Sequence, residues 1–134
     1  MRSFAQRLML LLTILLLAGC APAHPSKTQV AGTWKVQHNF GTETLTISTN
    51  GTFTQMLVEK NGRASQNQGH WELVPVAEKV SGSQVLLHDA LVFSTPFGER
   101  ELDTHRADWK LEVLHEWGRL ILCFNPDLPG FHKE

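Results

Sequence analysis

The chain has 134 residues, with twelve basic and thirteen acidic side chains and a formal net charge of −1 when histidine is neutral. This length allows one small domain with a single core. The balanced charge, with no basic patch, argues against a nucleic-acid-binding protein.

The first twenty residues have the layout of a secretory signal peptide. Arg2 and Arg7 supply positive charge, residues 8–17 are apolar apart from Thr13, and the first acidic residue is Glu43. The apolar run is too short to cross a membrane as a helix, which needs about 20 residues.

The signal ends in Leu17-Ala18-Gly19-Cys20. This stretch resembles the lipobox of bacterial lipoproteins, where a leucine, a small residue, Gly or Ala, and the modified cysteine follow one another. The resemblance implies cleavage before Cys20, a diacylglycerol thioether on its sulfur and an acylated amine. It also implies an outer-membrane anchor facing the periplasm, because Ala21 rather than an aspartate comes next. An ordinary cut before His24 would instead give a soluble secreted protein.

We therefore divide the chain into a signal peptide (residues 1–19), a lipidated cysteine with a flexible tether (20–29) and a folded domain (30–134). Residues 21–29 contain two prolines and no large apolar side chain, which is typical of a tether. Fully extended, they would reach about 30 Å. Without Arg2 and Arg7 the mature chain has a net charge of −3.

Lipid on Cys20 leaves no second cysteine to form a disulfide with Cys123. Cys123 lies in the apolar run 120–124, which predicts a buried, inert thiol. A catalytic or disulfide-exchanging cysteine would need a more polar, partly exposed setting.

Residues 30–74 predict short strands joined by tight turns. Residues 44–48 alternate polar and apolar side chains, as a half-buried strand does. Asn50-Gly51 indicates a hairpin with a type I′ turn, and Asn61-Gly62 indicates a second hairpin. The alternation of the intervening strand slips at Gln55-Met56, which indicates a β-bulge.

The second half also has β character. Residues 84–87, 91–93 and 119–124 are strand-like, and residues 109–114 alternate well. One short helix is expected at 99–106. Many short antiparallel strands with closing turns predict an all-β barrel or sandwich.

Gly32-Thr33-Trp34 is echoed by Gly69-His70-Trp71, with both hairpin turns between them. Glycine lets two segments approach closely, and the tryptophan fills the space beside it. Over residues 30–74 the pattern resembles bacterial lipocalin-like domains. The resemblance implies a small antiparallel up-and-down barrel, sometimes with an apolar ligand inside. The chain has no Tyr, so the family's Asp and Tyr motif is absent, and Arg119 is a candidate for the arginine that packs over the first tryptophan.

No catalytic, metal or cofactor site is predicted. None of the seven histidines has the close spacing of a zinc site. His88-Asp89 and His115-Glu116 are adjacent pairs, whose side chains point to opposite faces of a strand. An enzyme whose site assembles from distant strands stays an alternative.

Two functions are expected. The first is a non-catalytic binding or scaffold module that docks an envelope protein through strand edges and loops. The alternative is a lipocalin-like carrier of an apolar small molecule. Four large aromatic residues would be core residues in the binding module and pocket walls in the carrier: Trp34, Phe53, Trp71 and Trp109. Candidate partner contacts are Phe97, in the long connection 94–108, and Trp117 at a turn.

Overall fold

The computed structural model describes residues 21–76, 82–92, 106–124 and 128–134. Within these ranges the chain is all-β apart from one helix of four residues. The elements in chain order are β1 (Ala21–Pro22), α2 (Lys27–Val30), β2 (Gly32–His38), β3 (Gly41–Ile47), β4 (Thr52–Glu59), β5 (Ala64–Pro75), β6 (Ser83–Leu91), β7 (Arg106–Glu116), β8 (Arg119–Cys123) and β9 (Phe131–Lys133). In the part of the chain that is described, no helix is long and apolar enough to span a membrane.

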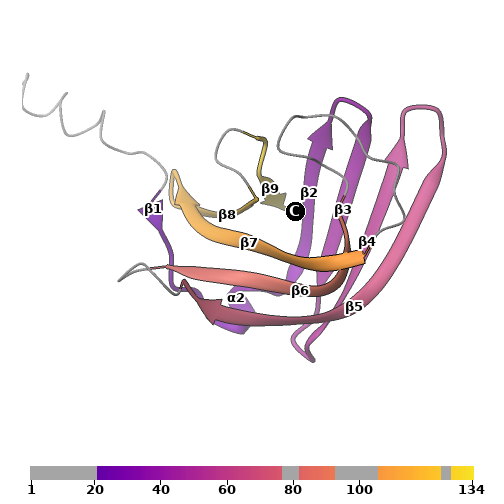
Figure 1. Ribbon diagram of the computed structural model, residues 1–134. Helices are drawn as coiled ribbons and strands as arrows, with labels where there is room; N and C mark the ends of the chain where they lie inside the picture. The colour runs from indigo at the N-terminus through magenta and orange to yellow at the C-terminus, as the bar shows by residue number, and fades with distance from the viewer. Residues whose placement is uncertain (1–20, 77–81, 93–105, 125–127) are drawn as a thin grey trace, which may run out of the picture.

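Eight of the described strands, β2 to β9, close into an antiparallel barrel (Figure 1). Each strand pairs with the next along the chain, and β9 returns to β2 by pairing Lys133 with Trp34 and His132 with Lys35. This order is that of an up-and-down barrel, and it confirms the predicted all-β, lipocalin-like architecture.

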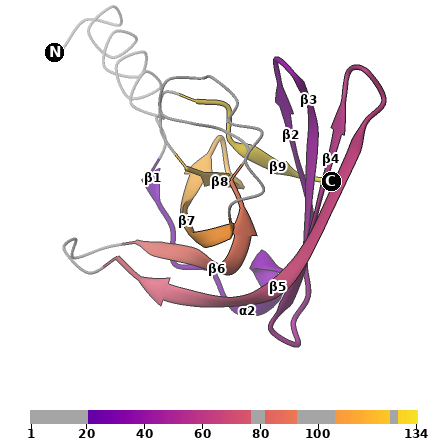
Figure 2. The same ribbon diagram turned by 45° about the vertical axis from the view of Figure 1, so that its right-hand side comes forward.

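β5 gives the barrel its curvature. Its residues 64–70 pair with β4, whereas residues 71–75 pair with β6. Figures 1 and 2 show β5 curving from the upright β4–β5 hairpin to the side of β6. Gly69 lies at the switch, where a Cβ would stand 2.5 Å from the carbonyl oxygen of His88 and 2.9 Å from the ring of Phe53. This close approach is the role predicted for glycine in the Gly-x-Trp pattern.

The inward-facing apolar side chains form one continuous core. Trp34, Phe53, Trp71 and Trp109 belong to it and are 0, 1, 5 and 3% exposed. Helix α2 packs on the same core, because Val30 is fully buried and its carbonyl oxygen accepts a 2.8 Å hydrogen bond from Trp34 Nε1.

The hairpin at Asn50-Gly51 is present, but its turn is not type I′ as predicted. Strand pairing stops at Ile47 and Phe53, so the loop is longer than the two residues that a type I′ turn requires. Gly51 has φ +87° whereas Asn50 does not have a positive φ. Asn50 Oδ1 instead accepts the backbone N–H of Thr52 at 3.1 Å. Asn61 and Gly62 form the second predicted hairpin in the same way.

The predicted bulge at Gln55-Met56 is wrong. Pairing of β3 with β4 runs without a shift from Thr42 to Ile47. Gln55 faces inward like an apolar residue because its amide group is fully hydrogen-bonded there, as described below. The described bulge lies between Leu87 and Ala90, where Asp89 has φ +55°.

The segment predicted as a flexible tether is folded onto the barrel from residue 21 onward. β1 pairs Ala21 with His115 of β7, and Ala23 is buried with its N–H donating to Val113 O at 3.2 Å. Ser26 then caps α2 through a reciprocal pair of bonds with Gln29. Composition does not reveal this packing, because the contacts are made by backbone groups, by the small side chain of Ala23 and by the His24 ring, which accepts a 3.0 Å hydrogen bond from Gly82 N–H.

Candidate functional site

The structure separates the predicted site residues. The four core or pocket candidates, three of them tryptophans, are buried, as given above. Trp117 is 74% exposed at the β7–β8 turn. Cys20 and Phe97 lie outside the described residues, as does the predicted helix up to residue 105. Cys123 is buried, as its apolar neighbours predict.

The outer side of β3, β4 and the first half of β5 carries no Asp, Glu, Lys or Arg side chain. Alternation along the three strands turns eleven residues outward, and cross-strand pairing aligns Thr44 with Met56 and Gln66, and Thr46 with Thr54 and Gln68. We call these eleven residues the uncharged face: Thr42, Thr44, Thr46, Thr52, Thr54, Met56, Val58, Ala64, Gln66, Gln68 and His70. Met56 and Val58 are 37 and 41% exposed.

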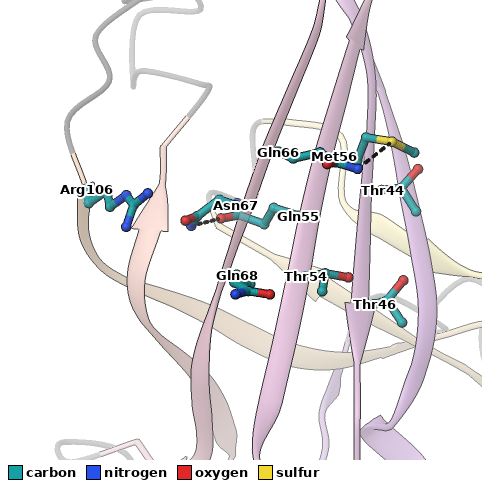
Figure 3. A pocket seen from close by; sticks show the side chains of 9 residues that line it. All are labelled: Thr44, Thr46, Thr54, Gln55, Met56, Gln66, Asn67, Gln68 and Arg106. Carbon is teal, nitrogen blue, oxygen red and sulfur yellow. Dashed lines mark hydrogen bonds between the residues drawn. The ribbon is translucent and has the colours of Figure 1, made fainter.

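An open hollow of about 590 Å³ lies over this face (Figure 3). Its lining combines hydroxyl, amide and thioether groups with one guanidinium, that of Arg106 across from Asn67. Hydroxyl and amide groups both donate and accept hydrogen bonds. The hollow therefore offers neutral polar contacts and a single cation at its edge.

Beneath the face, three polar side chains run through the barrel interior. Gln55 Nε2 lies 3.3 Å from Glu43 Oε1, and Asn67 Nδ2 donates to Gln55 Oε1 at 3.1 Å. All three residues are buried. Asn67 Nδ2 also donates to the backbone oxygen of Asp89 at 2.7 Å. These bonds hold the end of β6 against β4 and β5, so the network positions strands.

Glu43 connects this network to the barrel rim. Its Oε2 lies 2.8 Å from His38 Nε2, and the His38 ring stacks on Phe40. Burial raises the pKa of Glu43 above its ordinary value of 4.5, and the hydrogen bonds from His38 and Gln55 oppose that rise. The Glu43 carboxyl group is therefore poised to hold a proton more readily than an exposed one.

A second, smaller pocket of about 90 Å³ lies at the rim, lined mainly by aromatic side chains. His38 and Phe40 come from the β2–β3 hairpin, and Trp109 and Phe131 come from β7 and β9. It lies where β2 extends past its last pair with β9, at Lys35. Trp109 Nε1 is buried there without a hydrogen-bond partner among the described residues.

The histidines do not assemble a metal site in the described ranges, where no group of three His, Cys, Asp or Glu side chains is placed to hold an ion. His88 lies beside Asp108, with 3.3 Å between Nδ1 and Oδ1, and 3.8 Å from Glu72. Both partners come from neighbouring strands and are exposed, which is typical of a solvated surface cluster.

Sequence reasoning missed Glu43, Gln55 and Asn67. The signal for two of them was present, because Glu43 alternates with Leu45 and Ile47, and Gln55 alternates with Phe53 and Leu57. A polar residue between two inward-facing positions must itself face inward unless the strand bulges.

Comparison of the chain with protein-family models, with curated proteins and with solved structures finds no match. Its class is therefore defined by architecture, an eight-stranded up-and-down β-barrel with a neutral outer sheet face.

Proposed function

We propose that this protein is a lipid-anchored, non-catalytic binding module of the bacterial envelope, and that the uncharged face docks a protein partner. The observation that carries the proposal is the absence of Asp, Glu, Lys and Arg from eleven neighbouring outward positions, two of which are the exposed apolar residues Met56 and Val58. Charged residues are depleted from the centres of protein interfaces, and exposed apolar patches mark interaction sites.

The packing of the interior favours docking over transport of an apolar molecule. Trp34, Phe53 and Trp71 are buried together in one core. The rim pocket of about 90 Å³ is well below the roughly 300–1,000 Å³ of small-molecule sites. It has room for one side chain of a partner rather than for a lipid.

The chemistry of the face specifies the partner surface. A neutral sheet of threonine and glutamine side chains best matches another neutral, hydrogen-bonding protein surface, since a charge placed there would be desolvated without a counter-ion. Arg106, at the edge of the hollow, would pair with one carboxylate of the partner.

The lipid anchor on Cys20 is the second part of the proposal and has its own test. One acyl chain holds a protein only marginally, whereas two or more hold it stably. Cys20→Ser should abolish fatty-acid labelling and release the protein from the outer membrane. Unchanged labelling and membrane association would refute the anchor.

Site-specific photocrosslinking in intact cells tests the docking face. A photoreactive residue at Met56 or Gln68 should give an adduct of defined mass, and the same residue at Lys110, exposed on the outside of β7, should not. Thr54→Lys should reduce the Met56 adduct at least tenfold with unchanged thermal stability. Equal adducts from all three positions would refute the face, and an adduct of twice the protein's own mass would replace the partner with a second copy.

A further inference from the structure

Trp117 is held in a strained and exposed position. It is the most exposed large hydrophobic residue of the described chain. Glu116 pairs with Arg119, so Trp117 and Gly118 form a two-residue turn, in which their φ values are +50° and +76°. Two positive φ values in a two-residue hairpin loop define a type I′ turn.

Folding does not explain a tryptophan here. The first central position of a type I′ turn favours Asn, Asp or Gly, and a bulky residue at positive φ is strained. The Asn50-Gly51 and Asn61-Gly62 turns keep positive φ at glycine alone, so Trp117 is the one non-glycine residue with positive φ in the described hairpin turns that end in glycine. Backbone strain combined with exposure of a large apolar side chain points to a contact outside the chain.

The turn lies beside the proposed lipid attachment point. Ala21 pairs with His115, two residues before Trp117. Strand geometry keeps the Cα atoms of Ala21 and Trp117 within about 13 Å of each other, and Cys20 is the residue that precedes Ala21 in the sequence. A bilayer that holds lipid on Cys20 is therefore within reach of the turn.

Residues that come after Trp117 in the sequence have side chains suited to contact with a lipid headgroup. Arg119 is exposed and lines a hollow of about 540 Å³ together with His132 and Lys133, whose Nζ donates to the carbonyl oxygen of Gln29 at 2.8 Å. Glu134 also lines it but forms an ion pair with Lys35. Tryptophan is enriched at membrane–water interfaces, and an adjacent arginine can extend to lipid phosphate groups.

We propose that Trp117 inserts into the headgroup region of the anchoring membrane and fixes the orientation of the barrel. This inference rests on the lipid anchor of the proposed function. Figures 1 and 2 show β1 and the end of β7 on one side of the molecule and the β4–β5 hairpin on the other. With Trp117 in the membrane, the uncharged face is directed away from the lipid, where a partner can reach it.

Tryptophan fluorescence of the lipidated protein in vesicles tests this orientation. The vesicles contain phosphatidylethanolamine and phosphatidylglycerol, with a quencher attached at headgroup depth. The other three tryptophans are at most 5% exposed, so shallow quenching reports on Trp117. The wild-type protein should be quenched, and Trp117→Asn should lose most of that quenching, stay vesicle-bound and melt a few degrees higher, because Asn suits the turn.

A matched control moves the tryptophan. Trp117→Asn combined with Asn61→Trp keeps four tryptophans but places one in the β4–β5 turn, and it should not be quenched. Equal quenching of wild type and Trp117→Asn, or quenching of the control, would overturn the orientation while leaving the anchor standing. Failure of the wild-type lipidated protein to float with vesicles would refute both the anchor and the orientation.

Discussion

The side-chain amide of Gln55 pairs with both backbone groups of Leu91. Oε1 accepts the Leu91 N–H at 2.9 Å, and Nε2 donates to the Leu91 carbonyl oxygen at 2.9 Å. Gln55 thus provides hydrogen-bond partners for the backbone groups at the end of β6, as a neighbouring strand would. At this point β5 has stopped pairing with β6.

Replacing Gln55 should therefore destabilise the barrel. Gln55→Leu leaves the two Leu91 backbone groups and Asn67 Nδ2 with fewer partners, and should lower the free energy of unfolding by about 2 kcal/mol. Urea denaturation measures the loss. Gln84→Leu, on the outer side of β6, is the control and should change stability by no more than about 0.5 kcal/mol. Equal effects of the two substitutions would contradict a structural role for the amide.

The buried carboxyl group of Glu43 should make stability depend on pH. Its pKa is raised above 4.5 in the folded protein by burial, so the folded state holds the proton more tightly than the unfolded state. This contribution is fully present below pH 4.5 and is lost as pH rises through the raised pKa. Glu43→Gln mimics the protonated form and lacks this loss.

The measurement is the difference in unfolding free energy between Glu43→Gln and wild type, from pH 4 to pH 8. Groups that do not contact Glu43 cancel in this difference, which should shift in favour of the variant as pH rises. A difference that stays constant over the range would show that Glu43 does not titrate abnormally.

Gly69 should tolerate no larger residue. The Cβ of Gly69→Ala would meet backbone and aromatic atoms that cannot easily move, His88 O and the Phe53 ring. Overpacking of this kind costs about 1–3 kcal/mol. Ser65→Ala, on the same strand, should cost no more than about 0.5 kcal/mol. Thermal unfolding of both variants checks the difference, and a neutral Gly69→Ala would show that β5 can move away from β6.

Cys123 should be protected from thiol reagents in the folded barrel. Its Sγ packs so closely on Gly130 that a Cβ there would lie 2.9 Å from the sulfur. In a Cys20→Ser protein, where Cys123 is the remaining cysteine, labelling should be at least about 100-fold slower in buffer than in guanidinium chloride. Similar rates in the two solvents would mean that the thiol is accessible.

The fold class was predictable because turn residues and strand alternation are local signals. Asn50-Gly51, Asn61-Gly62 and Trp117-Gly118 all mark hairpins in the structure. The docking of residues 21–30 was not predictable, since it depends on backbone pairing with β7, which is distant in the sequence.

The candidate site was predictable only in part. Aromatic residues read as core or pocket walls proved to be buried, yet the uncharged face depends on three strands lying side by side in a given register. Each strand alone contains ordinary threonines and glutamines. These residues form a face only when the three strands lie side by side, and the sequence of one strand does not encode that arrangement.

The closing strand has a consequence for folding. β2 and β9 lie near opposite ends of the domain, and the ion pair across their junction joins Lys35 to Glu134, 99 positions later. Until residues 131–133 have been synthesised, β2 has an open edge and the barrel has no closed state. Closure of the barrel is then a non-local event of high contact order, and such events are intrinsically slow. Pairing of β9 with β2 is therefore the step that completes the fold, and it has to wait for the last residues of the domain.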